Sequence, residues 1–172
     1  MGKPVKTLHL LRHAKSSWDE PGVPDHDRSL APRGHRATKL LAEHLRRERI
    51  APALVLCSSA KRALQTLEGI APGFDTVVQT QVERGLYGAS EGELLERLHR
   101  IPDTEESVML IGHNPAIHGL ALSLAGGGPD PVGVEQKYPT GALATLTFEG
   151  TWQQLEPGGA QLAAFVRPKD LR

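Results

Sequence analysis

The sequence predicts an α/β fold in which helices cover both faces of a mostly parallel sheet, forming a three-layer α/β/α sandwich. Short apolar runs alternate with amphipathic segments of helical periodicity along the whole chain, the pattern of repeated strand–helix units. The 172 residues are enough to bury one substantial core. Because neither an internal repeat nor a second domain is visible, we assign residues 1–172 to one domain.

Each expected element follows from this alternation. Strands are expected at Val5–Leu11, Ala53–Cys57, Thr76–Val78, Ser107–Ile111 and Ala142–Phe148, with an edge strand at Ala163–Val166. Helices are expected at Gly34–Arg49, Ala60–Ile70, Glu91–Arg100 and Pro115–Leu124. The polar, proline-bearing segment Ser17 to Pro32 should be a long surface loop, a type of segment that is often functional. Gly126 to Pro129 should be a flexible connector.

Composition excludes several classes of function. Lysine plus arginine and aspartate plus glutamate number 20 each, so no overall field favours nucleic acid or a membrane surface, and any preference for anions must be local. Cys57 is the only cysteine, which excludes an internal disulfide and a CxxC metal site. No apolar run approaches the ~20 residues of a membrane-spanning helix. We therefore expect a cytoplasmic protein with neither a nucleic-acid partner nor a membrane partner.

Polar clusters follow three of the predicted strands. They are Arg12-His13, Ser58-Ser59-Ala60-Lys61-Arg62 and Gly112-His113-Asn114-Pro115. Ligands of open α/β sheets bind outside the carboxyl ends of the strands, and right-handed crossovers place those ends on one rim. Arginine forks and free N–H groups at a helix start both bind phosphate oxygens. The sequence therefore predicts that His13, Ser58 and Gly112 converge on a phosphate-binding site.

These motifs resemble the histidine phosphatase superfamily, also called the phosphoglycerate mutase-like or RHG family. Within it, LLRHAKSSW, Asp27-Arg28-Ser29-Leu30 and Gly112-His113-Asn114-Pro115 are most similar to the SixA-type phosphohistidine phosphatases. The resemblance extends from about Thr7 to Phe148. Ala14 stands where the family motif usually has glycine, and alanine would be strained at a positive φ angle. We expect an ordinary backbone conformation at Ala14 and retained function.

The resemblance implies a phosphoglycerate mutase-like fold and a role for each motif residue. His13 corresponds to the nucleophile that forms a phosphohistidine enzyme intermediate. His113 corresponds to the second histidine, which donates a hydrogen bond to a transferring oxygen. Glu83 is the candidate general acid, since the family places its acid between the two histidine motifs. The expected phosphate-binding residues are Arg12, Arg62 and His113.

The remaining polar residues have lesser expected roles. The resemblance favours Asp27 and Arg28 as residues that order the long loop. Four other histidines should be structural or superficial, namely His9, His26, His99 and His118. The histidines form no HExxH pattern, and the triple glycine at 126–128 lacks the Lys-Ser or Lys-Thr of a P-loop. We therefore expect no metal and no cofactor.

The leading hypothesis is a metal-independent phosphatase that hydrolyses protein phosphohistidine. Its partner is then a phosphorylated protein, with a small phosphate ester as the other substrate class. Two alternatives stay open: a phosphatase or mutase of small esters that uses the same site, and a non-catalytic phosphate-binding module. The chain has few residues for a lid, which favours a side chain presented on a protein surface, since small molecules usually need an enclosing pocket. The sequence makes no prediction of oligomeric state.

Overall fold

The computed structural model describes residues 4–126, 134 and 137–171. Within these residues six strands form one sheet with the order β3-β2-β4-β1-β5-β6. The strands are β1 (Val5–Arg12), β2 (Leu54–Ser58), β3 (Gln79–Glu83), β4 (Ser107–Gly112), β5 (Leu143–Glu149) and β6 (Gln161–Val166). The first four are mutually parallel, and β5 runs antiparallel to both β1 and β6. The predicted mostly parallel α/β sheet is confirmed.

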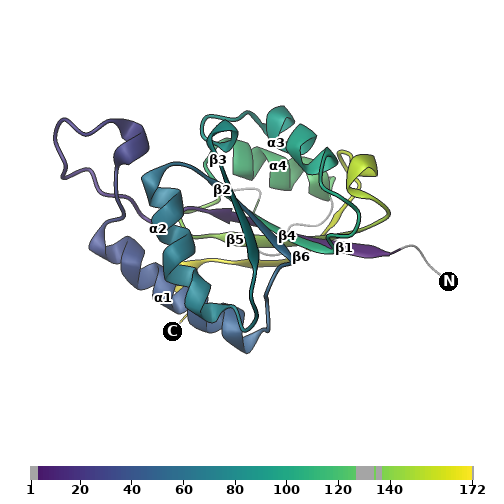
Figure 1. Cartoon of the computed structure of the whole chain (residues 1–172), viewed down its shortest axis with the longest axis horizontal. Coiled ribbons are helices and arrows are strands. Elements are labelled where there is room, and N and C mark those ends of the chain that lie inside the picture. Colours follow the sequence, from purple (N-terminus) through teal and green to yellow (C-terminus); the bar gives the residue numbers. More distant parts are fainter. Residues whose placement is uncertain (1–3, 127–133, 135–136, 172) are drawn as a thin grey trace.

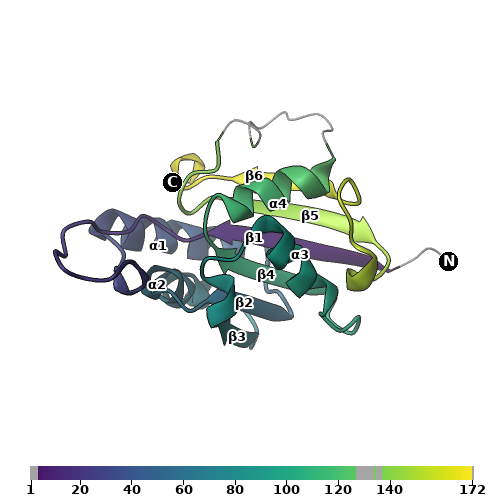
Figure 2. The same cartoon turned by 90° about the horizontal axis from the view of Figure 1, so that it is seen from above.

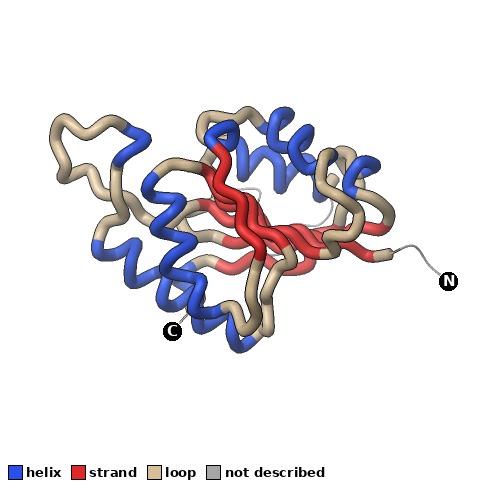
Figure 3. Tube along the Cα trace, viewed as in Figure 1, coloured by secondary structure: helices blue, strands red, loops and turns tan. Residues whose placement is uncertain are grey.

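Helices cover both faces of this sheet. Those in the described part of the chain are α1 (Pro32–Arg47), α2 (Lys61–Ile70), α3 (Glu91–His99) and α4 (Ala116–Ala125). Figure 1 shows α1 and α2 on one face and α3 and α4 on the other, and Figure 2 gives the view from above. The sheet lies between two helical layers (Figure 3). The three-layer α/β/α arrangement is therefore confirmed.

The central strands build two cores because successive side chains point to opposite faces of a sheet. Leu8, Leu10, Leu54, Leu56, Val108 and Leu110 enter the core under α3 and α4. Leu11, Val55, Cys57, Met109 and Ile111 enter the core under α1 and α2. A parallel strand buried on both faces has a continuous apolar sequence. This explains why β1, β2 and β4 could be predicted from the sequence.

The third strand lies elsewhere than predicted. The sequence favours Thr76–Val78, but β3 spans Gln79–Glu83. In the described part of the chain β3 is an edge strand that pairs with β2 alone, and four of its five residues are exposed. Its polar sequence therefore carries no burial signal, whereas Val77 in the predicted segment is fully exposed. The edge strand β6 is likewise longer than the predicted Ala163–Val166.

Two further expectations concern connectors and membranes. Gly126 ends α4 in a left-handed conformation, with φ 70°, while the other three residues of the predicted connector, 127–129, lie outside the described residues. No helix in the described part of the chain has the length and apolar character needed to cross a membrane.

The segment between β1 and α1 projects beyond the carboxyl ends of the parallel strands (Figures 1 and 2). An isolated bridge between Ser16 and Leu30 closes its base. The Leu30 N–H also donates to Oε1 of Gln65 on α2, over 2.7 Å. Both ends of the long loop are thus fixed, so the loop extends from the rim where the site was predicted.

Candidate active site

The three strand ends meet as the sequence predicts. Arg12 is in register with Gly112 on the neighbouring strand, and the His13 N–H donates to the Gly112 carbonyl over 3.1 Å. The rings of His13 and His113 consequently lie 5.1 Å apart, centroid to centroid. Ser58, at the end of β2, lies 2.8 Å from Nε2 of His113 through its hydroxyl oxygen. The sheet itself therefore brings the two motif histidines together.

His13 is buried and is held in one tautomer. Its Nδ1 lies 2.7 Å from the carbonyl oxygen of Ala14. A carbonyl only accepts, so Nδ1 must carry the proton and Nε2 keeps its lone pair. Burial lowers the pKa of His13 to about 3, so the ring is neutral at neutral pH. A neutral imidazole with a free Nε2 is able to attack phosphorus.

Ala14 fixes this orientation although it replaces the usual glycine. Arg49 is the one non-glycine residue with a positive φ in the described part of the chain, so Ala14 has the ordinary conformation that we expected. Its N–H donates to Oγ1 of Thr66 over 2.9 Å. The Thr66 hydroxyl in turn donates to the Arg62 carbonyl over 2.7 Å. Thr66 therefore positions the peptide whose carbonyl orients the His13 ring.

His113 is also neutral, because burial lowers its pKa to about 4. The Ser58 hydroxyl accepts from the Ala60 N–H over 3.2 Å. Among the described residues, His113 Nε2 is the acceptor left for the Ser58 proton, which assigns the His113 proton to Nδ1. This Nδ1 is buried and has no hydrogen-bond partner in the described part of the chain. A phosphoryl oxygen in the site would provide the missing acceptor.

Arg12 and Arg62 each also contain a buried N–H donor that lacks an acceptor among the described residues. Arg12 donates to the Tyr138 carbonyl over 3.0 Å, and Arg62 donates to the carbonyl and the carboxylate of Asp25 over 2.7 and 3.0 Å. In both arginines Nε is buried, and no described residue accepts a hydrogen bond from it. Burial and the nearby Arg62 charge also lower the pKa of Arg12. Unpaired buried donors are costly, and an anion would relieve both the unpaired donors and the repulsion between the guanidinium groups.

These groups surround a cavity of about 240 Å³. Its lining is Arg12, His13, Lys15, Ser16, Trp18, Arg28, Arg62, His113, Asn114 and Thr140. Four of these side chains are cationic, and none of the described lining residues is acidic. The described part of the chain also holds no group of three or more His, Cys, Asp and Glu side chains that could bind a metal ion. The arrangement is suited to a phosphoryl group.

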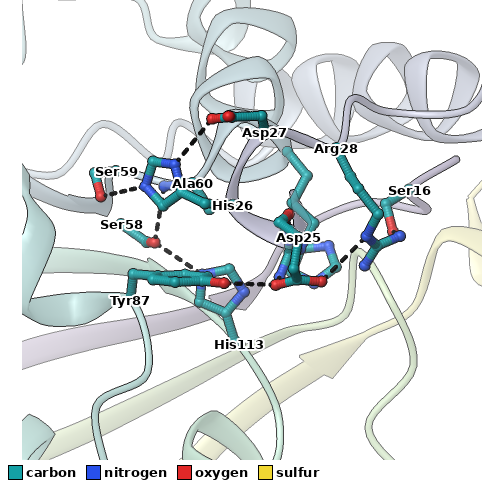
Figure 4. Close-up of polar contacts among 12 residues, drawn as sticks. Ser16, Asp25, His26, Asp27, Arg28, Ser58, Ser59, Ala60, Tyr87 and His113 are labelled. Atoms are coloured by element: carbon teal, nitrogen blue, oxygen red, sulfur yellow. Dashed lines mark hydrogen bonds and ion pairs between the residues drawn. The ribbon is translucent and has the colours of Figure 1, made fainter. Parts of the chain in front are cut away.

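Figure 4 shows Asp25 of the long loop in contact with Tyr87 and Arg28. Its carboxylate accepts from the Tyr87 hydroxyl over 2.7 Å and from Arg28 Nε over 3.1 Å, besides its contact with Arg62. These bonds, that of Tyr87 first, hold the pKa of Asp25 well below its usual range. The Tyr87 ring also lies edge-on to His113, at 5.6 Å between centroids. Asp25 therefore connects the loop to α2 and to the segment after β3.

The sequence alone does not identify several of these residues. Asp25 and Tyr87 lie in loops, far apart in sequence, and no local pattern marks either. His26, expected to be structural or superficial, bonds to the Ser59 hydroxyl over 2.8 Å and contacts the Tyr87 ring at 4.8 Å. The other three histidines of that group make hydrogen bonds with residues outside the site. His9 bonds to the Thr145 hydroxyl, His99 to the Leu155 carbonyl and His118 to the Val134 carbonyl.

The two predicted loop-ordering residues differ in their contacts. Arg28 donates to the Ser16 hydroxyl over 2.9 Å and to the Ser17 carbonyl over 3.1 Å. Its guanidinium carbon also lies 3.6 Å from the centroid of the Trp18 ring. Among the described residues, the Asp27 side chain has one partner, the neighbouring His26 at 3.2 Å. Arg28 is therefore the residue of the pair that holds the loop together.

Glu83 is not brought into the cavity. It ends β3 beside Ser58, but both of its carboxylate oxygens accept from Arg97 on α3, each over 2.8 Å. This pairing lowers the pKa of Glu83, whereas a general acid needs a proton near neutral pH. The acid role of Glu83 stays a prediction that has no support from this geometry.

Comparison with known proteins agrees with the geometry. The family model described as histidine phosphatase superfamily (branch 1) matches residues 8–98. The uncharacterized protein Rv1276c of Mycobacterium tuberculosis is 40% identical over 163 residues, 92% of this chain and 100% of the relative. A structure assigned as the phosphohistidine phosphatase SixA of Nakamurella multipartitia has a TM-score of 0.84 at 30% identity, covering 98% of this chain and 99% of that one. A second SixA assignment, from Agrobacterium tumefaciens, has a TM-score of 0.83 at 28% identity, covering 96% and 99%.

Proposed function

The chain belongs to the histidine phosphatase superfamily, and on that premise we propose that it hydrolyses phosphohistidine on a protein through a phosphoryl group carried by His13. One observation carries the proposal: the cavity presents a neutral His13 with a free Nε2 among four cations, and none of its described lining residues is acidic. Such a site can hold and accept a phosphoryl group. Its described lining residues offer no carboxylic acid to a leaving group.

In the first step Nε2 of His13 attacks the phosphorus, and the P–N bond of the substrate breaks. Arg12 and Arg62 hold the equatorial oxygens, and the His113 Nδ1–H donates to one of them. Donors fixed in place before the reaction stabilise transition-state charge without reorganising. The substrate imidazole, already protonated on its far nitrogen, leaves as a neutral ring.

In the second step a water molecule attacks the phosphorus of the phosphorylated His13. The bond from phosphorus to Nε2 breaks, and the protons of the water leave with inorganic phosphate. His13 returns to its neutral form, with its proton still on Nδ1. The Ala14 carbonyl holds that proton throughout both steps.

The substrate class follows from what each leaving group requires. An alcohol leaves from a phosphate ester only when a proton is supplied to its oxygen, which is the task of a general acid. A ring-protonated imidazole leaves without such help. The ion pair of Glu83 with Arg97, and a cavity without an acidic lining residue in the described chain, therefore favour phosphohistidine. The two SixA-assigned structures support the same choice.

A turnover comparison tests the substrate. The wild-type chain is given a histidine-phosphorylated peptide, a phosphoserine peptide of matched sequence and glycerol 3-phosphate, all in the presence of EDTA. We expect kcat/KM for the phosphohistidine peptide to exceed that of both esters by about tenfold or more. Ester hydrolysis that is orders of magnitude faster would refute phosphohistidine as the substrate, but the assignment as a phosphatase would stand.

A trapping experiment tests the nucleophile. Enzyme that is rapidly denatured in alkali, where a phosphohistidine persists, should carry labelled phosphate on His13, and His13→Ala should lower turnover by about 10⁴-fold while remaining folded. His35→Gln, an exposed histidine on α1, is the matched control and should behave as wild type. Label on any other residue would show the assignment to be wrong.

A further inference from the structure

A second cationic surface lies beside the catalytic cavity. It is a groove of about 480 Å³ lined by Arg12, Lys15, Arg33, Ala37, Lys137, Pro139, Thr140, Arg167, Pro168 and Lys169. Arg12, Lys15 and Thr140 line both the groove and the cavity. We propose that this basic groove binds carboxylates of the protein that presents the phosphohistidine. The inference rests on the proposed function and adds the chemistry by which the partner is recognised.

The charge of the groove is local and largely uncompensated. The whole chain has 20 cationic and 20 acidic side chains, yet six cations line the groove and no acidic residue is among its described lining. Arg167 is paired with Asp170 at 3.0 Å. Four other cations are exposed and have no ion pair in the described part of the chain, namely Lys15, Arg33, Lys137 and Lys169. A concave surface lined by one sign of charge concentrates ligands of the opposite sign.

The backbone under these cations is tightly fixed to the catalytic strand. A Cβ on Gly34, in the first turn of α1, would lie 2.1 Å from the Lys15 carbonyl oxygen. Gly141 has φ +77°, and a Cβ there would lie 2.7 Å from Cγ of Pro168. The Gly141 N–H donates to the carbonyls of both Arg12 and His13 over 3.0 Å. These close approaches require glycine and hold four segments of chain at fixed positions relative to His13.

Carboxylates on a protein fit this groove better than the phosphates of a small molecule. Here the free cations are exposed, and three of the four are lysines, whose compact charge does not impose the planar, two-point geometry of arginine. Cations at separate positions along the groove can each pair with a different acidic side chain of one polypeptide. Because the groove adjoins the cavity, these acidic residues would flank the phosphohistidine.

The test neutralises groove cations that lie outside the catalytic cavity. The groove variant is Arg33→Gln, Lys137→Gln and Lys169→Gln. The matched control removes the same charge from exposed α1 positions outside the groove lining, as Arg36→Gln, Lys39→Gln and Arg47→Gln. Both variants should hydrolyse p-nitrophenyl phosphate, which is too small to reach across the groove, at the wild-type rate.

Binding is measured by fluorescence anisotropy with two labelled peptides, neither of them phosphorylated. Both surround a central histidine with four residues, glutamate in one peptide and glutamine in the other. We expect wild type and control to bind the glutamate peptide more tightly, and the groove variant to lose about tenfold in affinity for it alone. Raising the salt concentration should remove the preference. Equal affinity for both peptides, or an equal loss in the control variant, would overturn the inference.

The two hypotheses fail separately. Poor turnover of the phosphorylated peptides would refute only the proposed function. The binding data would still test whether the groove binds carboxylates. Equal turnover of the phosphorylated glutamate and glutamine peptides, together with equal binding, would refute carboxylate binding in the groove. The proposed phosphohistidine phosphatase activity would stand. A labelled oligothymidylate that binds more tightly than the glutamate peptide, through the same three cations, would assign the groove to nucleic acid and overturn the inference.

Discussion

Two regions of the molecule carry positive charge side by side, but they hold it differently. In the cavity, Arg12 and Arg62 are fixed by the Tyr138 carbonyl and by Asp25, and both Nε atoms are buried. In the basic groove, the free cations such as Arg33 and Lys169 are exposed and unpaired within the described chain. Fixed, desolvated donors stabilise charge that develops in a reaction, whereas exposed charges give weak attraction that salt screens. We therefore assign the fixed arginines of the cavity to phosphoryl transfer and the exposed cations of the groove to recognition of the partner protein.

The largest expected effect is a dependence of stability on pH, which arises from three buried histidines, His13 and His113 in the cavity and His9 within β1. Burial lowers the pKa of His9, His13 and His113 to about 4, 3 and 4, against ~6.5 in the unfolded chain. As the pH falls below ~6.5 the unfolded chain takes up protons that the folded chain does not, so stability is lost from pH ~6.5 down to the folded pKa values of about 4 and 3. Calorimetry should show Tm falling by roughly 10 °C or more from pH 7.5 to pH 5.

Two variants sharpen this result. His13→Asn should reduce the fall in Tm, since one buried histidine no longer contributes. The groove variant should keep the wild-type pH dependence, because it removes none of the buried histidines. A Tm that does not change with pH would contradict the burial of neutral histidines.

The next effect compares a buried arginine with an exposed one. Arg62→Lys keeps the charge but loses the planar fork that reaches Asp25 at two points, so we expect kcat/KM to fall about 100-fold for p-nitrophenyl phosphate and for the phosphohistidine peptide. Arg33→Gln removes a charge entirely, yet it should leave ester hydrolysis within about twofold. Equal losses in the two variants would abolish the distinction between the regions.

How much could be predicted from sequence depends on burial and on chain distance. β1 and β4 are buried on both faces, so their apolar runs are visible, and with them the positions of His13 and His113 at the strand ends. β3 is exposed along most of its length and gives no such signal. Asp25 meets Arg62 and Tyr87 across 37 and 62 residues of chain, a contact that no local periodicity encodes. The basic groove likewise joins segments that only the fold brings together.

A smaller effect concerns the contact that holds Arg62 in place. Asp25→Asn removes the charge that faces Arg62, and we expect about tenfold lower kcat/KM on both substrates. Tyr87→Phe loses only the hydroxyl that donates to Asp25, with an expected loss of about threefold. Asp27→Asn, two residues away and exposed, is the control and should change neither rate.

A double-mutant cycle separates positioning from general damage to the loop. If Asp25 acts through Arg62, Asp25→Asn should cost little further activity in the Arg62→Lys background. Fully additive losses would show that Asp25 supports the fold rather than the orientation of the guanidinium group.

The smallest effect is expected at Glu83, which lies outside both cationic regions and is paired with Arg97. Glu83→Gln should leave turnover of the phosphohistidine peptide within about twofold, since a protonated imidazole needs no acid. Phosphoserine turnover should fall further, by about fivefold, still far below the 10²–10⁴ that a well-placed acid contributes. Arg97→Gln is the matched variant, because it removes the partner that lowers the pKa of Glu83 and should shift ester hydrolysis alone. Equal losses on both substrates would mean that Glu83 supports the end of β3 and does not serve a leaving group.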